Sequence, residues 1–300
     1  MNAAMRQSER FPGGPRVVAI GGGHGQAKSL AAIRQFASSV TAIVSVADDG
    51  GSSGRLRKEL GIPAPGDLRR CVHALLPEDS LLGDALEHRF GAGELEGHAF
   101  GNLLLAALCV ATDDFADAVG EACRLLDTVG VVWPATTTPV TLCASTRDSE
   151  LAGQVRIMAT EGVTEVSLNP IDAPSPEGAI RAIKEAEMVV LGPGSLYTSV
   201  LAALVPRDVR DALHFCEAKT VYVCNLRQQI PETAGYSVGL HVEALIAHGI
   251  TPDVVIADTR EIDLGEVPRG VELRTAALTS VKAAVHDVDL LAKELVSLLP

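Results

Sequence analysis

Aromatic residues are scarce in this chain and make up only 3% of its 300 residues. The core must therefore consist mainly of Ala, Val, Leu and Ile, the usual filling between helices and a parallel sheet. Paired C-x-x-C spacings are missing among the six cysteines, which argues against a zinc site and indicates reduced thiols in a cytosolic protein. A hydrophobic content of 47% predicts a large globular core.

The chain also lacks an excess of positive charge, and it has no long apolar run. The net charge of −13 argues against binding to nucleic acid or to an anionic membrane, so any anionic ligand must be held by local groups. The longest apolar run, residues 103–111, is far shorter than the roughly 20 residues of a membrane span. Residues 1–15 lack an apolar run and are predicted to be a disordered leader, followed by one cytoplasmic domain over residues 16–300.

Two glycine-rich stretches each follow a short apolar, β-branched run that predicts a buried strand. Residues 17–20 lead into 21–25, and residues 42–46 lead into 47–55. Glycines at the end of a strand expose successive N–H groups and leave room for a ligand, which suits phosphate. A single such stretch is more often an ordinary turn, whereas two after neighbouring strands favour a shared pocket.

A third loop of this kind, residues 192–199, follows the predicted strand 188–191 and opens a helix whose free N–H groups attract anions. Three such loops predict one crevice at the topological switch point of an open sheet. The fold is therefore predicted to be α/β and Rossmann-like, with an open, mostly parallel sheet and helices on both faces. The β-branched runs at 131–133, 140–142 and 153–157 predict a small antiparallel β insertion at about 130–170.

Two familiar nucleotide-binding motifs are incomplete here. Gln26 stands where the dinucleotide fingerprint has its third glycine, and Ala27 stands where a P-loop has the glycine before its lysine. Lys28 is therefore interpreted as a solvated helix residue. No complete nucleophile and base set is visible, so no catalytic residue is assigned.

Basic residues gather between the loops at Arg55, Arg57 and residues 69–70. In an acidic chain they look like counter-charge for a diphosphate, although they can equally pair with neighbours such as Glu59. Asn102 can be either a helix N-cap or a ligand contact.

Six stretches together resemble the gluconeogenesis factor family (YvcK type), the bacterial branch of the 2-phospho-L-lactate transferase-like (CofD-like) superfamily. They are GGGHG at 21–25, VADDGGSSGRLR at 46–57, PGDLR at 65–69, GHAFGNLL at 97–104, LGPGSLYT at 191–198 and VYVCNL at 221–226. The resemblance covers about residues 17–257. The chain departs from the family pattern at His24, where the family usually has threonine, and at Gly239-Leu240, where the family's acid before His241 is missing.

The resemblance implies a Rossmann-like fold, a cytoplasmic location and binding of a UDP-sugar such as UDP-N-acetylglucosamine, with effects on gluconeogenic growth, cell-wall precursor supply and cell shape. An unidentified regulatory protein is expected as partner, and homo-oligomer formation stays open. The ligand-binding residues expected from the loops and the resemblance are Gly22, Gly23, His24, Gly25, Asp48, Asp49, Gly50, Ser52, Ser53, Arg55, Asp67, Arg69, Asn102, Gly192, Gly194, Ser195, Tyr197, Thr198, Asn225 and Tyr236.

Two alternatives to a nucleotide-sugar-binding regulator stay open. The first is a magnesium-dependent transferase of phosphorus-containing groups, in which Asp48 and Asp49 would hold the metal and arginines would neutralise developing charge. The second is a purely structural interaction protein. Only the transferase requires a cofactor, Mg²⁺.

Overall fold

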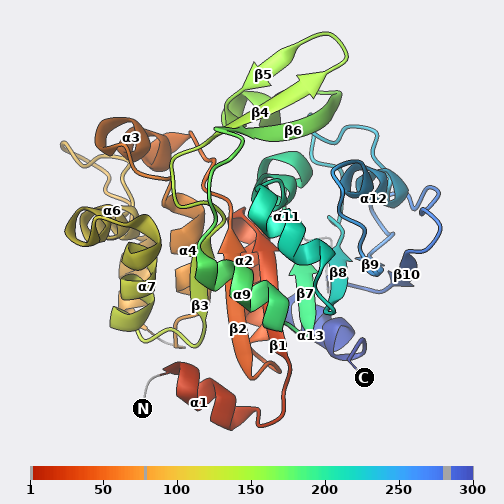
Figure 1. The fold of residues 1–300 in the computed structure, drawn as a ribbon, viewed down its shortest axis with the longest axis horizontal. Helices are drawn as coiled ribbons and strands as arrows, with labels where there is room; N and C mark the ends of the chain where they lie inside the picture. The colour runs from red at the N-terminus through yellow and green to blue at the C-terminus, as the bar shows by residue number, and fades with distance from the viewer. Residues whose placement is uncertain (1–2, 78–79, 280–284, 300) are drawn as a thin grey trace.

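The structure, a computed structural model, describes residues 3–77, 80–279 and 285–299. Its centre is a sheet of parallel strands in the order β10-β9-β8-β7-β1-β2-β3 (Figure 1). The strand order reverses between β1 and β7, which confirms the predicted switch point. The strands are β1 (Arg16–Gly21), β2 (Ser39–Val44), β3 (Val131–Pro134), β7 (Met188–Leu191), β8 (Lys219–Val223), β9 (Val254–Ala257) and β10 (Glu272–Thr275).

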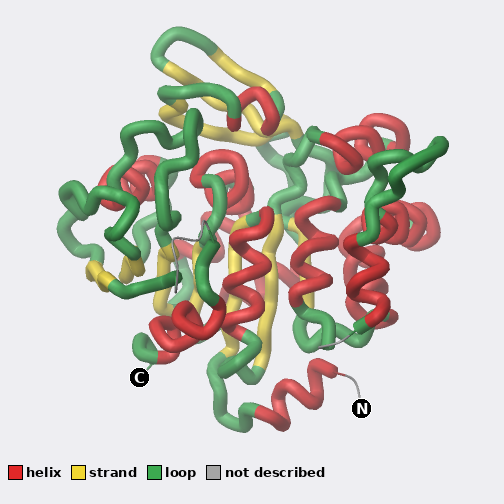
Figure 2. The backbone as a smooth tube through the Cα atoms, turned by 180° about the vertical axis from the view of Figure 1, so that it is seen from behind, coloured by secondary structure: helices red, strands yellow, loops and turns green. Residues whose placement is uncertain are grey.

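Helices cover both faces of this sheet (Figures 1 and 2). One layer holds α2 (Gly23–Ile33), α4 (Gly66–Ala74) and α13 (Val288–Val296), and the other holds α9 (Glu177–Glu185) and α11 (Arg207–His214). Beside β3, the helices α6 (Phe100–Thr112) and α7 (Phe115–Leu125) pack on each other. The remaining helices are α3 (Gly51–Leu60), α5 (Leu81–Glu87), η1 (Leu196–Leu201), α10 (Ala202–Leu204) and α12 (Val238–Ala247).

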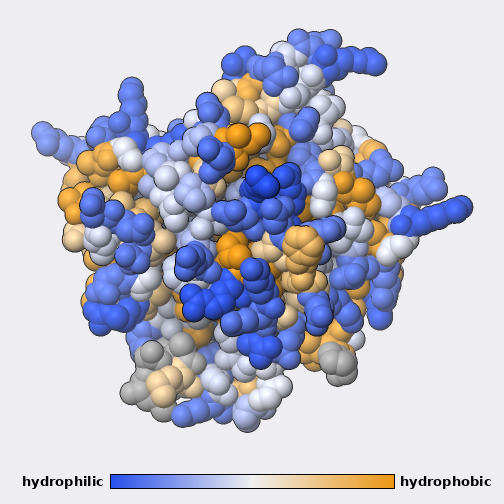
Figure 3. Space-filling view, viewed as in Figure 1, coloured by the Kyte–Doolittle hydropathy of each residue, from blue (hydrophilic) through white to orange (hydrophobic). Residues whose placement is uncertain are grey.

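The core consists of the small aliphatic residues expected from the composition. All four residues of β7 and the β1 pair Ala19 and Ile20 have no exposed surface, because helices cover both sides of these central strands. The face in Figure 3 is mainly hydrophilic, with smaller apolar areas between the polar side chains. Within the described ranges, no helix has the length and apolar character needed to cross a membrane.

A small antiparallel sheet stands beyond the carboxyl ends of the main strands, at the top of Figure 1. It contains β5 (Glu150–Ala152), β4 (Thr141–Thr146) and β6 (Val163–Asn169), in that order, and confirms the predicted β insertion. Two of the strands predicted for this insertion do not belong to it. Residues 131–133 belong to β3, a parallel edge strand of the main sheet, and residues 153–157 lie mostly in the helix α8 (Gln154–Met158). A short β-branched run indicates burial but does not reveal its partner.

Residues 1–15 were predicted to be a disordered leader, but within them the helix α1 (Ala3–Arg10) forms. The Gln7 side chain is only 4% exposed and donates to the carbonyl oxygens of Arg34 and Ala37, both at 2.8 Å. These carbonyls follow the end of α2, so the Gln7 side chain ties α1 to the segment after that helix. A polar contact of this kind leaves no trace in the hydropathy pattern.

Candidate functional site

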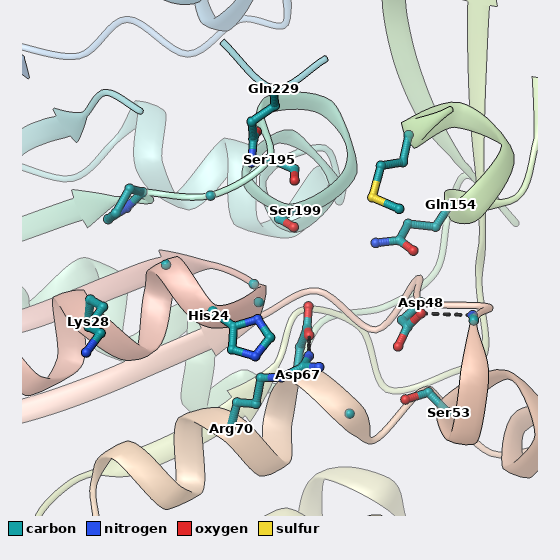
Figure 4. Close-up of a pocket in the computed structure, with 18 of the residues that line it drawn as sticks. His24, Lys28, Asp48, Ser53, Asp67, Arg70, Gln154, Ser195, Ser199 and Gln229 are labelled. Atoms are coloured by element: carbon teal, nitrogen blue, oxygen red, sulfur yellow. Dashed lines mark hydrogen bonds and ion pairs between the residues drawn. The ribbon is translucent and has the colours of Figure 1, made fainter. Parts of the chain in front are cut away.

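One pocket of about 720 Å³ opens at the carboxyl ends of the central strands, where the starts of several helices meet (Figure 4). Its volume is typical of a site for a small molecule. The predicted residues that line it are Gly22, Gly23, His24, Gly25, Asp48, Gly50, Ser52, Ser53, Asp67, Arg69, Asn102, Gly194, Ser195 and Asn225.

Three of the predicted residues contact other parts of the chain instead. Asp49 accepts a hydrogen bond from the backbone N–H of Val155 at 2.9 Å, so it holds the start of α8 rather than facing the pocket. Arg55 is exposed and donates to the Glu96 carbonyl oxygen at 2.7 Å. Gly192 lies next to β1, where its N–H donates to the Ile20 carbonyl oxygen at 2.9 Å.

The two predicted tyrosines bind each other behind the pocket. The hydroxyls of Tyr197 and Tyr236 lie 2.7 Å apart, and their rings meet edge to face. Tyr236 also packs edge to face on His241. Burial, followed by the hydrogen bond between Tyr197 and Tyr236, raises the pKa of Tyr197 well above its usual value. Neither ring lines the pocket, so this pair supports η1 from behind.

The starts of α2, α3 and α4 all point at the pocket without a capping side chain. Their N-cap residues are Gly22, Gly50 and Pro65, none of which provides a side-chain acceptor. Side chains cap α5, α7, α12 and α13, whereas α6, α9 and α11 lack a capping side chain as well. At the pocket, Asp67 accepts the Gly23 N–H and Asp48 accepts the Gly50 N–H. The remaining N–H groups at these helix starts carry a partial positive charge, so the arrangement attracts an anion.

Basic side chains reinforce these helix starts. Lys28, Arg69, Arg70, Arg89 and Arg227 line the pocket, against only two lining carboxylates. In the described part of the chain, the buried Nε atoms of Arg69 and Arg70 have no hydrogen-bond partner. Lys28, which was predicted to be a solvated helix residue, is half-buried and lines the pocket further along α2 than His24 (Figure 4). Arg69 pairs with Glu87 at 3.3 Å and Arg70 with Asp67, so neither guanidinium is free. Five cations against two carboxylates still give the pocket a positive balance that suits an anionic ligand.

Asp67 and His24 meet beneath these basic groups. Asp67 is 7% exposed and pairs with Arg70 at 2.5 Å. Burial raises the pKa of Asp67, and the Asp48 carboxylate raises it further, whereas Arg70 lowers it. Burial, followed by the Arg70 cation, lowers the pKa of His24, so its ring is neutral at pH 7. The residue that departs from the family pattern therefore brings a ring with one donor and one acceptor, not another cation.

The third loop is not the free anion site that was predicted. Glu232 is 2% exposed, and its Oε1 accepts the N–H groups of Tyr197 and Thr198 at 2.9 and 2.8 Å. The Gly194 N–H donates to Asn225 Oδ1 at 3.2 Å. An internal carboxylate therefore occupies the start of η1, and the loop offers the pocket hydroxyl groups instead, among them that of Ser195 (Figure 4).

The transferase alternative predicts a magnesium ion held by Asp48 and Asp49. Asp48 faces the pocket, and its Oδ1 accepts the Gly50 N–H at 2.9 Å. Magnesium is usually held by one or two protein carboxylates together with substrate phosphates. Asp48 faces the pocket and could be one of these protein carboxylates, whereas Asp49 is turned towards α8 and could not. Among the residues that the structure describes, no group of three or more His, Cys, Asp or Glu side chains forms a metal cluster.

Several lining residues could not be found from the sequence. They lie on segments read as loop, strand or ordinary helix, and only the folded chain brings them to the pocket. Gln154 and Met158 come from α8, and Gln229 comes from the loop after β8 (Figure 4). Val155, Val285 and His286 belong to the same group, whereas the lining residues Gly51, Gly66, Pro193, Ser199 and Leu226 lie within stretches that the sequence had singled out.

Acid should destabilise the fold through His286. This residue is 7% exposed and lies 3.1 Å from the Cys224 carbonyl oxygen through Nε2, and burial lowers its pKa from 6.5 to about 4. Between these values only the unfolded chain takes up the proton, so stability is lost as the pH falls from 6.5 to 4. The loss is about 3 kcal/mol. Urea unfolding should show that the wild type loses about 3 kcal/mol more free energy of unfolding over this range than His286→Gln, whose amide keeps the hydrogen-bond donor. Equal pH dependence of the two proteins would contradict the assignment.

Comparison with known proteins identifies the family of this fold. The family model "2-phospho-L-lactate transferase CofD" matches residues 17–297. The gluconeogenesis factor of Bacillus subtilis is 40% identical over 270 residues, covering 87% of this chain and 84% of that protein. The gluconeogenesis factor of Halalkalibacterium halodurans is 42% identical, covering 80% of this chain and 76% of that protein.

Solved structures and longer relatives complete the comparison. A crystal structure of a UPF0052 family member from Bacillus halodurans superposes with a TM-score of 0.88 at 34% identity, covering 93% of this chain and 98% of that one. Relatives from Nostoc sp. and Deinococcus radiodurans are longer, and the matches span only 52% and 60% of their lengths. The chain belongs to the CofD family, within its gluconeogenesis factor branch.

Proposed function

We propose that this protein binds a nucleotide sugar, UDP-N-acetylglucosamine being the first candidate, in the pocket at the strand ends. The observation that carries the proposal is the convergence, in one pocket, of three helix starts that lack a capping side chain with the basic side chains of Lys28, Arg69, Arg70, Arg89 and Arg227. Such a site suits a diphosphate, and in a chain of net charge −13 it is a local exception. The pocket volume of about 720 Å³ leaves room for groups attached to the phosphates.

Calorimetric titration with UDP-N-acetylglucosamine tests the proposal directly. We expect Lys28→Met to weaken binding about tenfold, because one charge-assisted contact to phosphate contributes about 1.5 kcal/mol. Lys28 forms no ion pair within the described ranges, so its loss should leave the thermal midpoint unchanged. Lys293→Met, on the exposed side of α13, is the matched control and should bind like the wild type. Absence of wild-type binding at millimolar ligand would refute the proposal.

The biological role proposed for this site is regulatory. The relatives carry the name gluconeogenesis factor, and we propose that the protein, in the cytoplasm, reports nucleotide-sugar supply to a protein partner and so affects gluconeogenic growth, cell-wall precursor supply and cell shape. Deleting the gene should impair growth on gluconeogenic carbon sources. Complementation by the wild type and by Lys293→Met, but not by a pocket variant that no longer binds the nucleotide sugar, would support the role.

A second candidate is a magnesium-dependent transferase, which one observation favours: Asp48 directs its carboxylate into the anion pocket. The residue to test is Asp48, since Asp49 holds α8. Magnesium-dependent turnover of phospho-donors that disappears in Asp48→Asn would support this candidate. Lack of turnover across a panel of donors would leave binding as the function.

A further inference from the structure

The Ser52 hydroxyl, at the start of α3, is held by two side chains from the segment 98–102. Ser52 is 4% exposed and lines the pocket. Its Oγ accepts an N–H from Asn102 Nδ2 at 3.0 Å, and it lies 3.0 Å from Nδ1 of His98. A buried hydroxyl with two such neighbours has a defined direction for its own proton.

The direction of that proton depends on His98. Burial, followed by the Arg55 cation, lowers the pKa of His98, so the ring is neutral at pH 7 and one of its nitrogens carries no hydrogen. If Nδ1 is that nitrogen, it accepts the Ser52 proton. If Nδ1 carries the hydrogen, it donates to Ser52 Oγ, and the Ser52 proton turns towards the pocket. The first arrangement gives this proton an acceptor within the protein even when the pocket is empty.

The consequence of the first arrangement is an acceptor beside the start of α3. With its proton directed at His98, Ser52 Oγ can accept a hydrogen bond from a ligand in the pocket. A sugar hydroxyl or an acetamido N–H supplies such a donor, whereas a phosphate oxygen does not. Asn102, which is 2% exposed, holds Ser52 through its Nδ2.

We propose that His98 is a positioning residue which, by accepting the Ser52 proton, keeps Ser52 Oγ ready to accept a hydrogen bond from the sugar of a bound nucleotide sugar. This inference rests on the proposed function for its ligand. The basic side chains and the remaining helix-start N–H groups hold the diphosphate, and Ser52 Oγ recognises a hydroxyl or amide group of the sugar.

The proton assignment can be tested on the wild-type protein without ligand. In a sample with ¹⁵N-labelled histidine at pH 7, His98 should show an unprotonated, pyridine-type Nδ1 and a protonated, pyrrole-type Nε2. A pyrrole-type Nδ1 would overturn the proposal whatever the protein binds. Because no nucleotide is present, this result stands apart from the outcome for the proposed function.

The recognition step is tested by calorimetry with UDP-N-acetylglucosamine and UDP. The affinity ratio of the two ligands measures what the sugar adds. His98→Asn places an amide oxygen near the Nδ1 position and should keep most of the wild-type ratio, whereas His98→Gln reaches the Nε2 position and should lower the ratio about 3- to 10-fold, the loss of one hydrogen bond. Equal weakening of both ligands, with the ratio unchanged, would overturn the positioning role while leaving the proposed function intact. If the wild type binds neither ligand, the proposed function and the sugar contact fail together.

Discussion

Replacing Gln26 with glutamate is expected to cost about 3–5 kcal/mol of the free energy of unfolding, the range for a buried charge left without a partner. Gln26 has no exposed surface, and its Nε2 donates to the carbonyl oxygens of Ala19 in β1 and Ile43 in β2, both at 3.0 Å. Glutamate would remove both donors and place a carboxylate against two carbonyl oxygens. Since whole domains are stable by only about 5–15 kcal/mol, urea unfolding followed by circular dichroism should show a large shift.

Two controls separate the charge from the change of side chain. Gln26→Leu removes the donors without adding a charge and should cost less than the glutamate. Gln35→Glu makes the same exchange at an exposed position, where Gln35 bonds Asp289, and should change stability by less than about 1 kcal/mol. The glutamate at position 26 should have a raised pKa, so its penalty should grow as the pH rises from 5 to 8. A Gln26→Glu protein as stable as Gln35→Glu would contradict the structural role of this side chain.

The same residue shows how far the sequence could predict the first loop. In the sequence, Gln26 argues against a dinucleotide-binding fingerprint, because it stands where that motif has its third glycine. In the fold it joins β1 to β2 through its side chain, directly below the glycines that face the pocket. The apolar runs of the central strands were predictable because both faces of these strands are buried. The edge strand β3 and the helix α8 were not, because their identity depends on neighbours that are distant in sequence.

The adjacent residues Asp48 and Asp49 show the corresponding limit for the site. The sequence predicted that both residues contact the ligand. In the structure, Asp48 faces the pocket, whereas Asp49 faces α8. Glycine-rich loops at strand ends predict where a ligand lies, because that depends on local backbone geometry. The direction of an acidic side chain depends on tertiary contacts, which is why Glu232, the residue that occupies the third loop, was not foreseen.

Glu232 leads to the second large effect. Its Oε1 accepts two buried N–H groups at the start of η1, and its Oε2 has no partner within the described ranges. Glu232→Ala would leave both N–H groups unsatisfied and open a cavity, at a cost of about 3 kcal/mol. Glu232→Gln keeps an amide oxygen as acceptor and should cost only about 1 kcal/mol. Urea unfolding of the two variants measures the difference.

Added acetate should distinguish an anion site from simple loss of packing. In Glu232→Ala the vacated start of η1 has the properties of an anion site, two N–H groups and the positive end of the helix, so acetate should raise its thermal midpoint. The wild type, whose own carboxylate fills that place, should not respond. Glu243→Ala, on the exposed side of α12, removes the same group from a solvated position and should neither lose stability nor respond to acetate. If acetate leaves the thermal midpoint of Glu232→Ala unchanged, the Glu232 carboxylate contributes through packing alone. The third loop would then not be a helix start that the protein's own anion occupies.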